Sequence, residues 1–275
     1  MKTTNYTVLS LNMFGTPFHP KHILKTLLRN DVRKRFSAIA GIISSLEADF
    51  VLLQEVHDFP HYFFLRKQLA SFPYTSYKKS LYGPRGGVVI FSKYPLASSH
   101  FYDFMNKGKI YNKSVTGYLS LKGILTAKLK NKDIWLFNTH LTQNSDHNWE
   151  PGNRFTPILK SQLEQLLVHT NSITNLGGQV ILAGDFNMPK NTAFYPKFLE
   201  DSGLTDAFAK DTFTTYHQSF LPVNANVGRV DYILTSPSLK IIKTGYILQM
   251  PLVDEHGESF YASDHMGLLV TYAGI

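Results

Sequence analysis

Residues 180–187 read Val-Ile-Leu-Ala-Gly-Asp-Phe-Asn, an apolar run that ends in a glycine, a carboxylate and an amide. Four consecutive apolar residues followed by a turn signal are typical of a strand that is covered on both faces of a sheet. Polar side chains just beyond such a strand lie at the sheet edge, where binding clefts form. This stretch therefore predicts a buried sheet with a polar site at one edge.

The same arrangement, an apolar run next to a short polar group, recurs along the chain. The other groups are Leu11-Asn12, Gln54-Glu55, Asn138-Thr139-His140, Gly228-Arg229-Val230-Asp231-Tyr232 and Ser263-Asp264-His265. Because strand ends of a packed sheet can face one shared cleft, groups that are distant in sequence can meet in space. Taken together, these groups indicate an enzyme.

Strand-like and helix-like segments alternate through the chain. Short β-branched or aromatic runs predict strands at residues 6–11, 50–53, 88–91, 124–129, 134–138, 180–183, 230–234 and 268–272. Apolar residues spaced by three and four predict helix faces within 23–28, 36–46 and 159–167. Residues 33–35 are expected on the solvated side of a helix and residues 59–64 on a buried helix face. Residues 101–113 are expected in a loop whose aromatic residues and lysines suit contact with a lipid surface, stacking on nucleic acid or ordinary solvation. The pattern predicts an α/β layered sandwich.

Composition limits the function classes. A chain of 275 residues, 43% of them hydrophobic, is expected to form one domain over residues 1–275. Its net charge of +8 favours anionic partners such as phosphate esters, nucleic acid or an acidic membrane surface. The absence of cysteine excludes disulfides, thiolate metal sites and a cysteine nucleophile.

The sequence contains no apolar stretch long enough for a transmembrane segment, and residues 1–20 lack the layout of a secretory signal. We therefore expect a soluble protein. Its compartment stays open, because it is either cytoplasmic or secreted after removal of a signal that precedes the numbering.

The polar groups contain the oxygen ligands that a hard cation prefers. Mg²⁺ usually binds one or two carboxylates together with waters and substrate phosphate oxygens. Glu55 and Asp264 are the carboxylate candidates, and Asn12, Asp185 and Asn187 are placed to orient waters or a phosphoryl group. A magnesium site, with Mn²⁺ as the alternative ion, is the expected cofactor site.

Two histidines provide groups that transfer protons near neutral pH. His140 and His265 follow or precede apolar strands, and Asp231 is a candidate to hold one ring in the required tautomer. Taken singly, each polar group also suits an ordinary turn or a structural hydrogen bond. Together with a metal ion, they suit in-line attack of water on phosphorus.

In this order, the polar groups resemble the endonuclease/exonuclease/phosphatase superfamily, also called the DNase I-like fold. The resemblance includes the glycine-led strand and turn Gly87-Val88-Val89-Ile90-Phe91-Ser92-Lys93-Tyr94-Pro95. It implies a four-layer α/β sandwich of two packed mixed β-sheets flanked by helices, with a Mg²⁺-dependent phosphoesterase site at one sheet edge.

The resemblance also implies roles for the site residues. The implied metal site consists of Glu55, Asn12 and Asp264, and the implied catalytic residues are His140, Asp185, Asn187, Asp231 and His265. In this scheme His140 stabilises the transition state or acts as general acid, and Asp231 orients His265. Either Asp185 or His265 takes the proton of the attacking water.

Local similarity to neutral sphingomyelinases suggests a substrate class. Residues 101–105, 122–125 and 263–268 resemble segments of that branch, although residues 246–262 lack the paired exposed aromatics of the secreted bacterial enzymes. The similarity implies a phospholipase C-like phosphodiesterase that contacts a phospholipid membrane peripherally. The substrate-binding candidates are Lys122, Asn138, Tyr111 and Phe104.

Three other functions stay open at this level. The positive charge and the shared site also suit an endonuclease or exonuclease that acts on nucleic acid. A phosphoinositide phosphatase is a further enzymatic alternative, without an inositol-specific signature in the sequence. A binding module that keeps the fold without catalysis is disfavoured by the intact set of polar groups.

Overall fold

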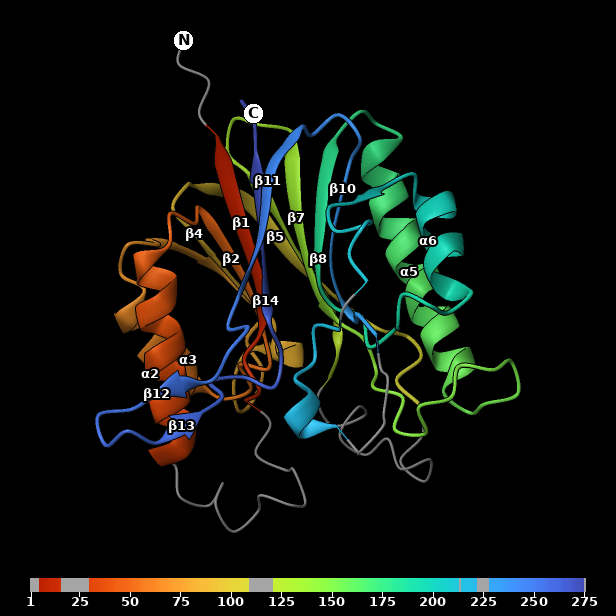
Figure 1. Ribbon diagram of the computed structural model, residues 1–275. Coiled ribbons are helices and arrows are strands. Elements are labelled where there is room, and N and C mark those ends of the chain that lie inside the picture. The colour runs from red at the N-terminus through yellow and green to blue at the C-terminus, as the bar shows by residue number, and fades with distance from the viewer. Residues whose placement is uncertain (1–4, 16–29, 109–120, 213, 222–227, 275) are drawn as a thin grey trace.

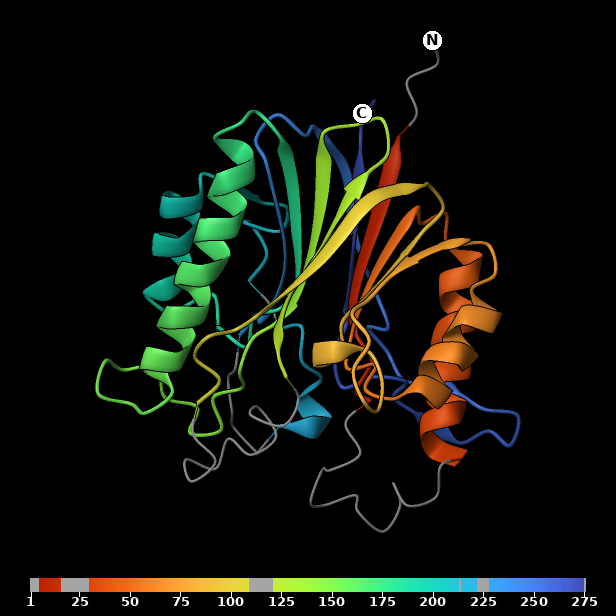
Figure 2. The ribbon, with the colours of Figure 1, turned by 180° about the vertical axis from the view of Figure 1, so that it is seen from behind.

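The computed structural model describes residues 5–15, 30–108, 121–212, 214–221 and 228–274. Two six-stranded sheets pack face to face, and a pair of helices covers the outer face of each (Figure 1). Figure 2 shows the same four layers from behind. This arrangement confirms the expected four-layer α/β sandwich.

Both sheets are mixed. The strand order in the first sheet is β11 (Ile241–Ile247), β14 (Gly267–Tyr272), β1 (Tyr6–Asn12), β2 (Phe50–Gln54), β4 (Val89–Ser92) and β3 (Tyr74–Ser76). The order in the second sheet is β5 (Leu96–Asp103), β6 (Gly123–Leu129), β7 (Ile134–His140), β8 (Gln179–Asp185), β10 (Asp231–Thr235) and β9 (Thr205–Asp206). A short hairpin, β12 (Leu252–Val253) with β13 (Ser259–Phe260), stands apart from both sheets.

The helices belong to two pairs. The first sheet is covered by α2 (Asn30–Ser45) and α3 (Phe59–Gln68), and the second by α5 (Thr156–Thr174) and α6 (Phe194–Ser202). Two 3₁₀ turns, η1 (Arg85–Gly87) and η3 (Gln218–Phe220), lie in the connections. No helix in the described part of the chain is long and apolar enough to cross a bilayer.

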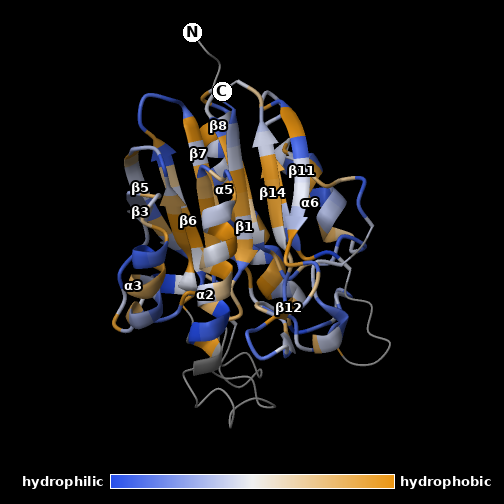
Figure 3. Ribbon diagram, turned by 60° about the vertical axis from the view of Figure 1, so that its left-hand side comes forward, coloured by the Kyte–Doolittle hydropathy of each residue, from blue (hydrophilic) through white to orange (hydrophobic). Residues whose placement is uncertain are grey.

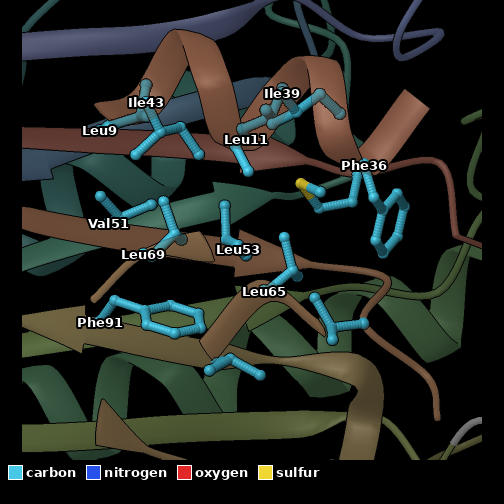
Figure 4. Packing of buried hydrophobic residues seen from close by; sticks show 14 of the residues in the cluster. Leu9, Leu11, Phe36, Ile39, Ile43, Val51, Leu53, Leu65, Leu69 and Phe91 are labelled. Atoms are coloured by element: carbon cyan, nitrogen blue, oxygen red, sulfur yellow. The ribbon is translucent and has the colours of Figure 1, made fainter. Parts of the chain in front are cut away.

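Side-chain alternation along the strands produces three apolar layers. In β1, Leu9 and Leu11 face the helices, whereas Val8 faces the second sheet. The outward residues pack against Phe36 and Ile39 of α2, as the close view of this layer shows (Figure 4). Because both faces are covered, the central strands are apolar along most of their length, and hydrophilic residues lie on the helices and in the loops (Figure 3).

Several elements differ from the expectations. Residues 96–103 form the edge strand β5, so Phe101 and Tyr102 belong to a strand and not to the expected 101–113 loop. The edge strands β5 and β11 have one face toward solvent and carry polar residues. They were therefore not predicted, because the prediction of strands relied on apolar runs. Residues 23–28 lie outside the described ranges. On α3 the expected buried face holds only in part, because Tyr62 is buried and Phe63 is exposed.

A buried ion pair fixes the start of β10. The guanidinium of Arg229 donates to both carboxylate oxygens of Asp206 and to the carbonyl of Asp231, and neither charged side chain reaches solvent. The Asp206 carboxylate also accepts a hydrogen bond from the hydroxyl of Tyr195 at 2.6 Å. Arg229 therefore stabilises the strand that carries Asp231, and within the sequence motif it has a structural role.

We expect Asp206→Ala to lower the free energy of unfolding by about 3–5 kcal/mol, because it leaves the Arg229 guanidinium buried without its partner. Urea denaturation of the purified variant measures this loss. Glu164→Ala is the matched control, since it removes an exposed pair with Lys160 and is expected to change stability by less than about 1 kcal/mol. Similar losses in the two variants would contradict this role of the ion pair.

Candidate active site

The strand ends bring the polar groups to one end of both sheets. β1 runs parallel to β2, with Asn12 opposite Gln54, and β7 runs parallel to β8, with His140 opposite Asp185. β10 runs antiparallel to β8, so its first residue, Asp231, also lies opposite Asp185. These residues therefore share one edge, as expected for polar groups at strand ends.

The Gly-Asp-Phe-Asn motif needs its glycine for close packing. Gly184 has φ of 146°, and a Cβ there would lie 1.9 Å from the carbonyl oxygen of Thr139 on β7. Only glycine therefore allows β8 to approach β7 at this point. The next residue, Asp185, is held by a 2.8 Å hydrogen bond from the backbone N–H of Asn187 to Oδ1.

The carboxylate of Asp185 stands at the centre of the site. Its Oδ2 atom accepts a 3.0 Å hydrogen bond from Nδ2 of Asn12, which belongs to the other sheet. The same oxygen lies 3.4 Å from Nε2 of His140 and 3.8 Å from Nε2 of His265. Burial raises the pKa of Asp185 to about 7, and the charge of Asp231 adds to this rise.

A second carboxylate orients the ring of His265. Nδ1 of His265 lies 2.8 Å from Oδ2 of Asp231, and the same oxygen accepts a 2.6 Å hydrogen bond from the Thr215 hydroxyl. Nε2 consequently faces Asp185 and Asp264. Burial opposes protonation of this ring, but the surrounding carboxylates outweigh it and hold the pKa of His265 well above its usual range.

His140 and Lys122 form the opposite side of the site. Burial lowers the pKa of His140 well below its usual range, and the positive charge of Lys122 lowers it further. The Lys122 ammonium donates a 2.7 Å hydrogen bond to the Leu141 carbonyl, and burial lowers its pKa to about 8. A neutral imidazole with its Nε2 near Asp185 therefore stands beside a buried cationic group.

Glu55 and Asp264 provide oxygens suited to a hard cation. Asp264 accepts a 2.6 Å hydrogen bond from the hydroxyl of Tyr216 at Oδ2, while its buried Oδ1 has no hydrogen-bond partner among the described residues. Burial and the negative charge of Glu55 raise the pKa of Asp264 to about 6. Asn12 binds Oε1 of Glu55 through Nδ2 at 3.3 Å. Two repelling carboxylates with an unpaired oxygen fit a Mg²⁺ site.

A second group of possible ligands overlaps the proton-transfer residues. One ligand atom from each of Asp185, Asp231 and His265 lies within 4.8 Å of the others. However, Oδ2 of Asp231 already accepts two short hydrogen bonds, from Thr215 and His265. This arrangement suits orientation of the imidazole better than direct metal binding.

Arg35 is a site residue that the sequence reasoning missed. We expected it on the solvated side of a helix, but its guanidinium is buried and donates to the carbonyls of Met13, Phe14 and Ala262. It thereby joins the segment after β1 to the segment before Asp264. One arginine within a helical basic run gives no sequence signal for this role, because the partners are backbone carbonyls. Thr215 and Tyr216 were also missed, because they lie in a connection far in sequence from Asp231 and Asp264, whose carboxylates accept their hydroxyl hydrogen bonds.

Two of the expected substrate contacts are wrong. The ring of Phe104 is fully buried between the second sheet and α5, so it cannot face a substrate or a membrane. Asn138 is also fully buried, and its amide spans the two sheets: Oδ1 accepts from Gln54, and Nδ2 donates to the carbonyls of Leu53 and Val89. Tyr111 lies outside the described residues. Of the three candidates that the structure describes, Lys122 is the one placed beside the site.

Two packed mixed sheets with such a site at their common end define the DNase I-like fold class. Residues 9–265 match the family model described as "Endonuclease/Exonuclease/phosphatase family", and the chain belongs to that family. Its members are phosphoric ester hydrolases that typically depend on a divalent metal ion. No curated protein matches the chain.

Solved structures share the fold along nearly the whole chain. Sphingomyelinase C from Streptomyces griseocarneus is 20% identical, with a TM-score of 0.71, covering 98% of this chain and 99% of its own. Truncated TDP2 from Caenorhabditis elegans is 19% identical, with a TM-score of 0.66 and coverage of 98% and 97%. An endonuclease/exonuclease/phosphatase family protein from Bacteroides thetaiotaomicron is 17% identical, with a TM-score of 0.68 and complete coverage of both chains. Identities this low establish the fold alone.

We expect Asp231→Asn to lower the pKa of His265, because it removes the carboxylate that lies 2.8 Å from Nδ1. NMR titration of the imidazole signals in EDTA measures this change. The raised folded-state pKa also links to stability: the contribution is fully present below the unfolded value of 6.5 and is lost as pH rises through the folded value. The stability difference between wild type and variant should therefore shrink at high pH. An unchanged His265 pKa in a folded variant would refute the assignment.

Proposed function

We propose that the protein is a Mg²⁺-dependent phosphodiesterase that hydrolyses phospholipids of the sphingomyelin type by in-line attack of water on phosphorus. The observation that carries the proposal is the meeting of His140 and His265 at Oδ2 of Asp185, beside the carboxylates of Glu55 and Asp264. Such a set places proton-transfer groups and a cation site around one small volume, as phosphoester hydrolysis requires.

In this mechanism His265 accepts the proton of the attacking water, and a proton passes to the leaving alcohol as its bond to phosphorus breaks. Its Nδ1–H is directed to Asp231, which leaves Nε2 facing the centre of the site as the accepting atom. The carboxylates that raise the pKa of His265 also make it a stronger base. Asp231 then stabilises the imidazolium that forms, so it acts through His265 and does not contact the substrate.

Asp185, Asn187 and His140 position the water and the phosphoryl group. Asn12 and the backbone of Asn187 hold both oxygens of Asp185 in place, and Oδ2 is directed toward the two imidazoles. Neutral His140 donates from Nε2 to a phosphoryl oxygen as negative charge develops in the transition state. The buried ammonium of Lys122 adds positive charge on the same side.

The residues suited to hold the metal ion are Glu55 and Asp264, with Asn12 fixing the carboxylate of Glu55. A bound Mg²⁺ would polarise the phosphoryl group and neutralise its developing charge. The choice of a phospholipid substrate rests on the sequence similarity of residues 122–125 and 263–268 to sphingomyelinases. The similarity of fold to sphingomyelinase C is consistent with this choice.

A nuclease is the second candidate, favoured by the net charge of +8. One experiment separates the two: phosphocholine release from sphingomyelin and phosphatidylcholine vesicles, run beside plasmid nicking, with Mg²⁺ and with EDTA. We expect phosphocholine release that EDTA abolishes, and Glu55→Gln should raise the Mg²⁺ concentration needed for half-maximal rate. Plasmid nicking with intact lipids would replace the lipid assignment, and full activity in EDTA would exclude the metal.

We expect His140→Ala and His265→Ala each to reduce kcat by roughly 10²–10⁴-fold, the usual contribution of a positioned acid or base. Asp231→Asn should cost less than His265→Ala, because it misorients the base without removing it. Circular dichroism and urea denaturation establish that each variant is folded. Near wild-type turnover of a folded His265→Ala protein would show that another group accepts the proton.

A further inference from the structure

A turn between β3 and η1 presents two large apolar side chains to solvent. Leu81 and Tyr82 are 81% and 76% exposed, which places them among the most exposed large apolar residues of the described chain. We call residues 79–84 the docking turn. Adjacent apolar side chains exposed on an ordered turn form a patch of the kind that marks an interaction site, unlike exposed apolar residues that are scattered singly.

The backbone of the docking turn is held firmly although its side chains are exposed. Lys79 and Pro84 pair as an isolated bridge, and Ser80 donates through both its N–H and its hydroxyl to the Gly83 carbonyl, at 2.9 and 2.8 Å. The Tyr82 carbonyl accepts a 3.0 Å hydrogen bond from the Phe59 N–H. Little conformational entropy would be lost when such a turn binds a surface.

The docking turn lies beside the active site. A Cβ on Gly83 would lie 2.3 Å from the His57 carbonyl oxygen, so the turn packs directly on the segment that follows Glu55. Glu55 directly follows the last residue of β2 and belongs to the site, and α3 begins at Phe59, two residues after His57. The turn therefore stands at the same end of the molecule as the strand-end carboxylates.

Aromatic and basic residues extend this surface across the start of α3. The Phe59 ring stacks on Phe63, with ring centroids 5.9 Å apart, and Phe63 is 59% exposed. The Lys79 ammonium lies 5.8 Å from the centre of the Phe59 ring, and Lys78 is also exposed. Beyond them, a shallow hollow of about 400 Å³ is lined by Arg33, Lys34, Ser37 and Phe64.

We propose that the docking turn, together with Phe63, is the surface by which the protein binds a phospholipid bilayer. Leu81, Tyr82 and Phe63 enter the interface, while the flanking lysines and Arg33 meet lipid phosphates. An aliphatic side chain beside aromatic rings and ammonium groups suits the boundary between acyl chains and headgroups, whereas nucleic acid offers leucine no stacking partner. The inference rests on the proposed lipid substrate and assigns membrane contact to a segment other than residues 101–113 or 246–262.

The test is vesicle flotation of the full chain in EDTA, with phosphatidylcholine and sphingomyelin vesicles, with and without phosphatidylserine. We expect Leu81→Ser combined with Tyr82→Ser to weaken vesicle binding by about 10-fold or more, because two apolar side chains no longer enter the interface. Val168→Ser combined with Leu176→Ser is the matched control, since these residues are 67% and 85% exposed but lie on α5 and just before the start of β8. The control should bind like wild type.

Lys78→Glu combined with Lys79→Glu should weaken binding mainly to vesicles that contain phosphatidylserine, and added salt should reduce that difference. Hydrolysis of a small soluble phosphodiester should stay unchanged in every one of these variants. The docking surface would be overturned by equal vesicle binding of wild type and the Leu81/Tyr82 variant, or by no vesicle binding of wild type. It would also be overturned if, in a parallel measurement of binding to duplex DNA, the variant lost only DNA binding. Flotation requires no turnover, so vesicle binding without phosphodiester hydrolysis would refute the proposed function and leave the surface standing.

Discussion

A hydrogen bond between two buried amides joins the sheets directly below the site. Nε2 of Gln54, the last residue of β2, donates at 2.7 Å to Oδ1 of Asn138 on β7, and Nδ2 of Asn138 returns two bonds to carbonyls of the first sheet. Apolar packing alone lets sheets slide, whereas buried amides lose their partners if the sheets shift by even one residue. The relative position of Glu55 and His140, which follow these two amides on either sheet, depends on this pair.

The site above this amide pair concentrates negative charge where water is scarce. Asp185, Asp231 and Asp264 are all buried, and Glu55 adds a fourth carboxylate nearby. Burial and mutual repulsion explain the raised pKa of Asp185 and Asp264, and the same carboxylates raise the pKa of His265. These four carboxylates repel one another. Either a divalent cation or a proton shared between Asp185 and His265 would reduce that repulsion.

The sequence predicted the buried strands and the polar groups at their ends because both depend on local pattern: an apolar run sets the strand, and the next residues face the edge. Thus the location of Asp185 and His265 could be predicted before the structure was known. The burial of Arg35, Phe104 and Asn138 could not be predicted from the sequence, because it depends on strand register and on which backbone carbonyls lie within hydrogen-bond distance. A polar residue in a strand gives the same sequence pattern whether its side chain contacts a substrate or the opposite sheet.

The first sheet places β14 directly beside β1, and the Ser263 hydroxyl caps the Asn12 carbonyl across 251 residues of sequence. During synthesis, β1 emerges from the ribosome before β14 and stays without this neighbour while the intervening chain is made. Until then its hydrogen-bonding edge is open, and Asp264 and His265 are absent from the site. Nascent chains therefore lack part of the candidate site and are exposed to aberrant strand pairing, so chaperone protection of β1 should matter more for the yield of folded protein than for the properties of finished molecules.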